Sequence, residues 1–233
     1  MKVLFVGEGN HDIGPSGDEG AVRRGVHAGE GRPAGGVVTA LACKVVPSID
    51  RASSRALAWR EVALITGDRK PGLDRKVKGA ALLAKRTMKL DALVCVHDRD
   101  GERNAYRFAD LTRGAAEVTA LPVACGLAVE SIEAWTLGAC EALAEELGLD
   151  PASLRKHYDA ARTETFLPNS GKSEKQPKAI LERVTAEAHR DAGVALREAV
   201  AERTDVETLA KRCPEGFGAF REELRKKLGP PEQ

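Results

Sequence analysis

The sequence predicts an α/β protein in which a parallel four-stranded sheet is flanked by helices and followed by a helical C-terminal region. Over residues 1–149, short apolar runs alternate four times with amphipathic segments, which is the pattern of strand–helix–strand units. Such units join parallel strands through right-handed crossovers. Over residues 150–233 the pattern contains helical segments only. We therefore divide the chain into an α/β domain (1–149) and a helical region (150–233).

The first half of the α/β domain contains two predicted strands separated by a long loop. Residues 2–6, KVLFV, form an apolar run that ends at Gly7, as a buried parallel strand does. Residues 14–36 hold so many glycines that we expect a long loop there. A helix is predicted over 37–47, and the run EVALIT at 61–66 predicts the second strand.

The second half of the domain supplies two further strands. An amphipathic helix over 75–89 precedes the third strand, DALVCVH at 91–97. A helix over 102–113 leads to a fourth strand near 118–124, and the segment 126–135 opens the next helix. In the C-terminal region, Asp150 and Pro151 form a helix N-cap and first helical position. Later helices are predicted to begin at three further positions, Pro177, Asp205 and Glu215.

Composition excludes several classes of protein. The chain has 36 Lys and Arg against 35 Asp and Glu, and this net charge of +1 argues against nucleic-acid binding by bulk positive charge, although it allows a local basic groove. No apolar run approaches the roughly 20 residues that a membrane helix needs. The N-terminal apolar stretch is too short for a secretory signal, so we expect a cytoplasmic protein without a membrane partner. The five cysteines stand singly, which disfavours a zinc site or a disulfide framework.

Three acidic residues follow the predicted strands. Glu8 comes after the first strand, and Asp98 and Asp100 come after the third. Open α/β sheets bind ligands beyond the carboxyl ends of their strands where the strand order reverses, and in a 2-1-3-4 order this point lies between strands one and three. Crowded carboxylates repel one another unless a cation holds them, and Mg²⁺ prefers oxygen ligands. We infer a magnesium-dependent phosphoryl site; the alternative is that the D-x-D-G segment forms only a turn.

Other phosphate-site motifs fit the sequence poorly. Gly7 and Gly9 are not followed by the third glycine of the dinucleotide fingerprint. The tripeptide Gly171-Lys172-Ser173 ends like a P-loop, but Phe166 stands where that motif needs glycine. A phosphohydrolase of the haloacid dehalogenase type would have Thr or Val in place of Glu102 and usually carries its motif on the first strand. That alternative stays open without being favoured.

The glycine-rich loop offers candidate phosphate contacts. It leaves the predicted sheet just after Glu8 and carries four basic residues, Arg23, Arg24, His27 and Arg32. A basic segment beside the acidic residues could close over a phosphate backbone. The alternative is an insertion without a role in binding.

Short ordered motifs along the chain resemble a known family. The segment from Gly7 to Asp12 resembles the E-G-x-x-D/E signature that opens Toprim domains, and the segment from Val96 to Gly101 resembles their D-x-D motif. Toprim domains occur in primases, in topoisomerases and in the nucleases associated with overcoming-lysogenization-defect and RloB-like ATPases. Three later segments resemble a family of small bacterial Toprim-like proteins: Ile132-Glu133-Ala134-Trp135, Gln176-Pro177-Lys178 and Cys213-Pro214-Glu215-Gly216-Phe217.

The resemblance implies a Rossmann-like Toprim fold and roles for particular residues. Glu8 would be a general acid/base or metal ligand, and Asp98 and Asp100 would bind Mg²⁺ or Mn²⁺. Glu133 would add a fourth carboxylate, although acids in the first turn of a helix are also favoured by the helix dipole. Lys178 would contact phosphate, or would simply be a solvated lysine at a helix start.

The function implied is a magnesium-dependent nuclease that hydrolyses phosphodiester bonds, with DNA favoured over RNA. By resemblance, it would serve as the effector of an antiphage defence system with an ABC-type ATPase partner, like the overcoming-lysogenization-defect ATPases. Two alternatives stay open. One is a non-catalytic Toprim-like binding module, and the other is a phosphohydrolase or nucleotidyl transferase acting on small phosphates.

Overall fold

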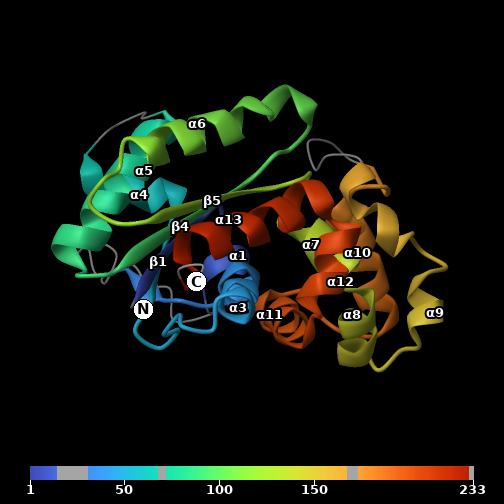
Figure 1. The fold of residues 1–233 in the computed structure, drawn as a ribbon. Coiled ribbons are helices and arrows are strands. Elements are labelled where there is room, and N and C mark those ends of the chain that lie inside the picture. The colour runs from blue at the N-terminus through green and yellow to red at the C-terminus, as the bar shows by residue number, and fades with distance from the viewer. Residues whose placement is uncertain (15–30, 68–71, 167–172, 231–233) are drawn as a thin grey trace.

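The fold is built on a five-stranded, mostly parallel sheet (Figure 1). The computed structural model describes residues 1–14, 31–67, 72–166 and 173–230. The strands lie in the order β2-β3-β1-β4-β5. Their bounds are β1 Val3–Gly7, β2 Arg32–Pro33, β3 Arg55–Ala58, β4 Ala92–Asp98 and β5 Val123–Ala128. β1 pairs in parallel with β3 and β4, β4 pairs in parallel with β5, and β2 runs antiparallel to β3.

Helices cover both faces of this sheet (Figure 1). Those within the first 149 residues are α1 Asn10–Ile13, α3 Gly36–Val45, α4 Trp59–Thr66, α5 Leu73–Leu82, α6 Tyr106–Ala116, α7 Ile132–Gly138 and α8 Cys140–Leu147. Those that follow are α9 Pro151–Leu154, α10 Pro177–Glu187, α11 Val194–Arg203, α12 Val206–Arg212 and α13 Ala219–Leu228. Short 3-10 turns span Glu102–Asn104 and Ala160–Thr165, and π-helical turns span Leu83–Thr87 and Pro214–Gly218.

The alternation of side chains along β1 divides the core into two layers. Val3 and Phe5 face the helices α3 and α13, in a cluster that also contains Phe220. Leu4 and Val6 face the opposite layer, which is formed by α4, α5 and α6 (Figure 1). This period of two is what a strand buried on both faces requires. The α/β class and the flanking helices predicted from the sequence are therefore confirmed.

The sheet contains one strand more than the sequence predicts. The four parallel strands are present, but β2 adds a short fifth strand at the edge, and it lies inside the segment predicted as a loop over 14–36. Arg32 is buried there and forms an ion pair with Glu61 of α4, which attaches this edge strand to the helix layer. The fifth strand could not be predicted from so short an element, because two residues carry no recognisable periodicity.

The second predicted strand was also wrong, because residues 61–66 are helical. They belong to α4, and the parallel strand is the preceding segment β3. The Glu61 carboxylate accepts a hydrogen bond from the Ala58 backbone N–H at 2.5 Å, which caps the start of the helix. Trp59 and Val62 are buried one turn apart, whereas Leu64 is 70% exposed. An apolar run of this length does not distinguish a strand from a half-buried helix.

The fourth predicted strand was placed about five residues too early. β5 continues through Gly126 to Ala128, where Ala128 stands beside Asp98 of β4, so the next helix begins only at Ile132. Gly126 occurs in this strand because the ring of Phe220 on α13 lies against it. A Cβ atom at this position would stand 2.5 Å from the Phe220 Cδ2 atom.

The remaining elements fall close to their predicted positions. β1, α3, α5 and β4 overlap the predicted ranges, and the 3-10 turn at Glu102 leads into α6 as expected. The predicted N-cap at Asp150 is confirmed, since its side chain accepts a hydrogen bond from the Ala152 N–H. Asp205, where a helix was predicted to begin, caps α12 by accepting a hydrogen bond from the Thr208 N–H. α10 begins at Pro177. The boundary predicted at residue 149 stays a prediction.

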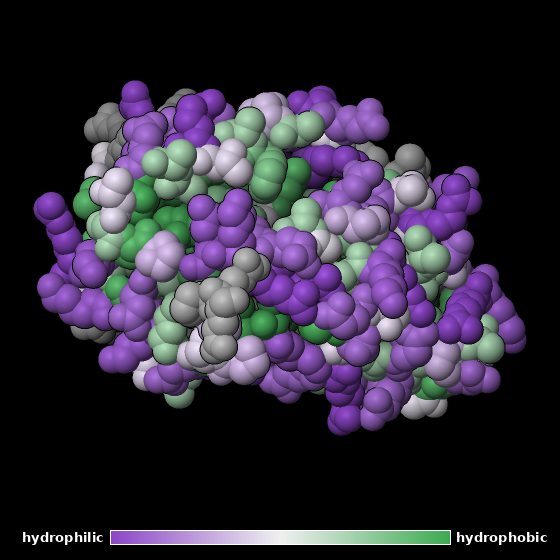
Figure 2. All heavy atoms as spheres, viewed as in Figure 1, coloured by the Kyte–Doolittle hydropathy of each residue, from purple (hydrophilic) through white to green (hydrophobic). Residues whose placement is uncertain are grey.

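The surface is mostly polar on the side shown. Hydrophilic residues cover most of the face seen in Figure 2, with smaller hydrophobic areas between them. Among the helices that the structure describes, none combines the length and apolar character needed to span a membrane.

Candidate acidic site

Glu8, Asp98 and Asp100 come together at the carboxyl edge of the sheet. β1 and β4 are adjacent parallel strands, so Glu8, directly after β1, lies at the same edge as Asp98 at the end of β4. Counting the parallel strands alone, the order is 2-1-3-4, and the chain changes direction of crossover between β1 and β4. The sequence predicted this convergence, and the structure confirms it.

One arginine contacts all three predicted residues. The Arg107 Nη1 atom on α6 lies 3.1 Å from the Asp100 Oδ2 atom and 3.8 Å from the Glu8 Oε1 atom. The same nitrogen donates a hydrogen bond to the Asp98 carbonyl oxygen at 2.6 Å. A single guanidinium can reach these three residues only because they share one small region of the surface.

Asp98 is the most deeply placed of the three carboxylates. Burial raises its pKa well above the usual value, and the neighbouring charges of Asp12, Glu8, Glu133 and Asp100 raise it further. The Asp98 Oδ1 atom accepts a hydrogen bond from the Ile132 backbone N–H at 3.1 Å, at the start of α7. The side chain therefore joins two distant segments, rather than capping only its own turn.

Asp100 occupies a turn and also contributes its side chain to the site. Its φ of 49° lies in the left-handed region, and Gly101 follows with a φ of 97°. Asn104 closes the turn by donating from its backbone N–H to the Gly101 carbonyl at 3.0 Å. The turn alternative is thus correct for the backbone, whereas the Asp100 carboxylate extends to Arg107. The two interpretations of the D-x-D-G segment do not exclude each other.

His97 holds the Glu8 side chain in place. Its Nδ1 atom forms an ion pair with Glu8 Oε1, and its ring stacks on Trp59 with centroids 6.1 Å apart. Trp59 is fixed in turn by a hydrogen bond from its indole N–H to the Val96 carbonyl at 3.0 Å. Burial alone would raise the pKa of Glu8, but the hydrogen bond from His97 and the charges of His97 and Arg107 outweigh it and lower the pKa. Glu8 is therefore held in its ionised form.

Glu133 belongs to the same group of acids and has its own counter-ion. It lies in the first turn of α7, and the Arg197 Nη1 atom of α11 approaches its Oε1 atom to 2.8 Å. Both side chains are largely buried. Burial would raise the pKa of Glu133, but the charge of Arg197 and further hydrogen bonds outweigh it and lower the pKa. The helix dipole alone would explain an acid in the first turn of α7, but it does not explain the ion pair of Glu133 with Arg197 of α11.

Asp12 is a member of the group to which the sequence analysis gave no role. It lies on α1, and its Oδ2 atom accepts a hydrogen bond from the Gly9 backbone N–H at 3.0 Å. Burial, followed by the neighbouring charge of Glu133, raises its pKa to about 7. The sequence did contain a signal for Asp12, because this residue is the last acid of the E-G-x-x-D/E signature that begins at Glu8.

Arg99, between the two aspartates, takes no part in this group. Its guanidinium forms a buried ion pair with Glu130, whose φ of 62° lies in the left-handed region. The backbone N–H of Arg99 donates to the Ala128 carbonyl at 2.9 Å. Arg99 therefore pairs with Glu130, whereas Asp98 and Asp100 on either side of it belong to the acidic group.

The donor set of the group fits a hard divalent cation. Glu8, Asp12, Asp100 and Glu133 each contribute to the raised pKa of Asp98, so four neighbouring acids oppose the ionisation of its carboxyl group by charge repulsion. A cation with a preference for oxygen ligands would relieve that repulsion. Within residues 1–14, 31–67, 72–166 and 173–230, no three His, Cys, Asp or Glu side chains already stand in a metal-binding arrangement. Glu8, Asp100 and Glu133 instead point to His97, Arg107 and Arg197.

The candidate phosphate contacts are placed only in part. Lys178 lies in the first turn of α10 with an exposed side chain, and α10 packs against α7, the helix that carries Glu133. Arg23, Arg24 and His27 lie outside the described residues. The roles predicted for these four residues stay predictions.

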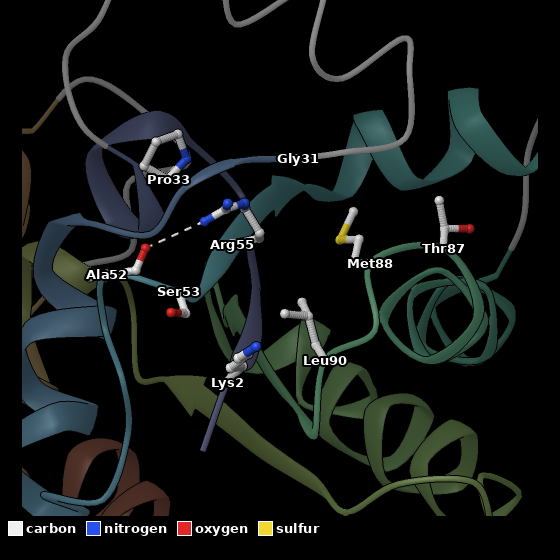
Figure 3. A pocket seen from close by; sticks show the side chains of 9 residues that line it. All are labelled: Lys2, Gly31, Pro33, Ala52, Ser53, Arg55, Thr87, Met88 and Leu90. Atoms are coloured by element: carbon white, nitrogen blue, oxygen red, sulfur yellow. Dashed lines mark hydrogen bonds between the residues drawn. The ribbon is translucent and has the colours of Figure 1, made fainter.

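A cavity of about 630 Å³ lies at the other end of the sheet (Figure 3). Lys2, Arg55 and Leu90 in its wall stand at or just before the amino ends of β1, β3 and β4. The acidic residues stand at the carboxyl ends of these strands. The cavity is therefore separate from the acidic site and plays no part in the chemistry considered for it.

Fold and site together define an α/β protein with a group of carboxylates at the carboxyl edge of its sheet. The chain belongs to the family described as a domain of unknown function (DUF4276), whose model matches residues 47–225. Asp98, Asp100 and Glu133 lie within the matched residues, whereas Glu8 and Asp12 precede them. Comparison with curated proteins and with solved structures gave no match.

Proposed function

We propose that this protein is a magnesium-dependent, Toprim-like nuclease that hydrolyses phosphodiester bonds in nucleic acid. The observation that supports the proposal is the meeting of Glu8, Asp98 and Asp100 around one arginine at the edge where β1 and β4 end. Strand ends at such a reversal point are where open α/β sheets bind their ligands. The group combines acidic oxygens, which suit Mg²⁺, with a guanidinium, which suits phosphate.

The residues would divide the work according to their surroundings. Glu8, Asp98, Asp100 and Glu133 would hold Mg²⁺ or Mn²⁺, which when bound polarises the phosphoryl group and activates a water molecule. The Glu8 carboxylate is ionised because its pKa is lowered, so one of its oxygens can accept a proton from that water. The positive charge of Arg197 lowers the pKa of Glu133 and so keeps this carboxylate ionised.

The substrate and partner follow from the Toprim resemblance rather than from the site. We propose DNA before RNA as the substrate, and an ABC-type ATPase of the overcoming-lysogenization-defect kind as the partner in an antiphage system. Co-expression with an ATPase encoded beside this chain, followed by size-exclusion chromatography, tests the partner. Separate elution of the two proteins would contradict this part of the proposal.

The nuclease activity is tested by comparing wild type with Asp98→Asn and Asp100→Asn. Plasmid, linear and single-stranded DNA and an RNA of equal length are incubated with Mn²⁺, Mg²⁺ or EDTA. We expect cleavage by wild type with metal and a loss of at least about a hundredfold in both variants, the scale on which a lost electrostatic or acid–base contribution acts. Asp110→Asn is the matched control, since Asp110 forms an ion pair with Arg113 on α6 and is not among the acids that raise the pKa of Asp98. Hydrolysis of free nucleotides but not of polymers would favour the small-phosphate alternative instead.

Thermal melting distinguishes a metal site from a turn without relying on turnover. Mn²⁺ should stabilise wild type by about 2.7 kcal/mol at a hundredfold excess over the dissociation constant. It should have little effect on Asp98→Asn. In EDTA this variant should be at least as stable as wild type, because the amide replaces a buried carboxyl group whose ionisation is opposed by burial and by the neighbouring acids. If neither Mn²⁺ nor Mg²⁺ changes the melting temperature of wild type, the metal site is contradicted and a non-catalytic module is supported.

A further inference from the structure

Arg107 stands where the proposed metal would have to act. Its guanidinium lies between the Glu8 and Asp100 carboxylates, at 3.8 Å and 3.1 Å from their nearest oxygens. The same group donates to the backbone carbonyl of Asp98. A positive charge from the protein itself thus neutralises two of the acids that the proposed function assigns to the cation. Two cations cannot share these oxygens without repelling each other.

The three arginines near the acids differ in how far their side chains are exposed. Arg197 is only 6% exposed, and a second hydrogen bond from its Nε atom to the Ala192 carbonyl at 2.7 Å anchors it beside Glu133. Arg99 pairs with the buried Glu130. The Arg107 side chain is 22% exposed and stands in the first turn of α6 at the rim of the group. Arg107 is the most exposed of the three, so its guanidinium is the one that water can solvate as it leaves the acids.

We propose that Arg107 is a positioning residue that holds Glu8 and Asp100 in the metal-free protein, gives them up to an entering divalent cation, and then binds a phosphate of the nucleic acid. The inference rests on the proposed function, because it uses the same carboxylates as metal ligands. A guanidinium suits both roles, since its fork of N–H donors matches carboxylate and phosphate oxygens equally well.

The two halves of this role predict opposite effects of one substitution. In Arg107→Gln the competing charge is gone, so Mn²⁺ should bind about tenfold more tightly, the change expected for one unit charge near 4 Å in a largely solvated site. Nucleic acid should bind more weakly, because one phosphate contact is lost. For single-stranded DNA, the slope of log affinity against log salt concentration should become shallower by about 0.7. If Arg107 had only a structural role, its replacement by Gln would not make Mn²⁺ bind more tightly.

Titration calorimetry of the full chain with Mn²⁺, together with binding of a labelled single-stranded DNA in Ca²⁺ at several salt concentrations, tests the proposal. Arg107→Lys should keep wild-type Mn²⁺ affinity, because it keeps the charge. Arg103→Gln is the matched control, since Arg103 is exposed four residues earlier. Melting in EDTA confirms that each variant is folded.

The outcomes separate this inference from the proposed function. Tighter Mn²⁺ binding by Arg107→Gln supports the inference, even where wild type binds the ion too weakly to measure. Measurable binding by wild type with equal or weaker binding by Arg107→Gln overturns the inference and leaves the metal site standing. Failure of both proteins to bind Mn²⁺ overturns the metal site, and the inference with it.

Discussion

Asp12 gives the acidic group a pH dependence of its own. Burial and the charge of Glu133 raise the pKa of Asp12 from 3.8 to about 7. In the unfolded chain this carboxyl would release its proton near pH 4, whereas the folded protein retains the proton up to about pH 7. The folded state therefore binds more protons within this window, and its stability falls as the pH rises.

We expect the metal-free protein to lose stability between about pH 4 and pH 7, with Asp12 contributing on the order of a few kcal/mol to that loss. Asp12→Asn should flatten this part of the profile, because an amide has no proton to release. Urea denaturation in EDTA across the pH range measures the effect, with Asp159→Asn as control, since Asp159 is an exposed cap far along the chain. A variant profile as steep as that of wild type would show that Asp12 is ionised throughout.

The neighbouring acids show how surroundings assign different states to the same chemical group. Glu133 has Arg197 at 2.8 Å and a lowered pKa, whereas Asp98 has four acidic neighbours and a raised one. The residue type alone does not carry this information. Arg197 stands 64 residues after Glu133, and Arg107 reaches Glu8 from 99 residues away. Counter-ions recruited over such separations leave no local pattern, so Glu8, Asp98, Asp100 and Glu133 could be predicted from the sequence, whereas Arg107 and Arg197 could not.

At the scale of single elements, β5 and α13 approach each other closely at Gly126. Gly126 of β5 accepts the ring of Phe220, and a Cβ atom there would come within 2.8 Å of Phe220 Cγ. We expect Gly126→Ala to destabilise the protein by about 1–3 kcal/mol through overpacking. In a Phe220→Ala background, Gly126→Ala should destabilise the protein by less, because the ring that obstructs the new Cβ atom is absent.

A double-mutant cycle by urea denaturation measures that coupling. Strictly additive effects of Gly126→Ala and Phe220→Ala would contradict the close approach of the two elements. The wild-type, single and double variants should all retain their far-ultraviolet circular dichroism, so that the comparison concerns packing alone.

Elements with two independent local signals were predicted well, and elements with one were not. β1 and β4 combine an apolar run with a glycine or aspartate stop, and both were found within one residue. α4 was missed because its apolar run is short and its cap comes from Glu61, three residues inside the helix. The acidic site was predicted because strand ends were known, and their convergence depends only on the parallel order of strands.

At the scale of the whole molecule, the C-terminal helices complete the core on one face of the sheet. Phe217, Phe220, Leu224 and Leu228 are nearly or fully buried in the same cluster as Val3 and other residues of the strands. The last helix, α13, therefore packs against the sheet that contains the first strand, β1 (Figure 1). The family match over 47–225 likewise crosses the boundary predicted at residue 149.

We therefore expect a fragment of residues 1–149 not to fold on its own. Loss of the four buried side chains on and before α13 removes about 1.5–3 kcal/mol of burial each, a sum comparable with the 5–15 kcal/mol by which whole domains are stable. Loss of Arg197 would also leave Glu133 without its counter-ion beside Asp98 and Asp12. The fragment should lack a cooperative thermal transition and should bind a hydrophobic dye, whereas a chain ending at Gly229 should melt like the full chain. A cooperative transition and Mn²⁺ stabilisation in the fragment would show instead that the acidic site belongs to an independent domain.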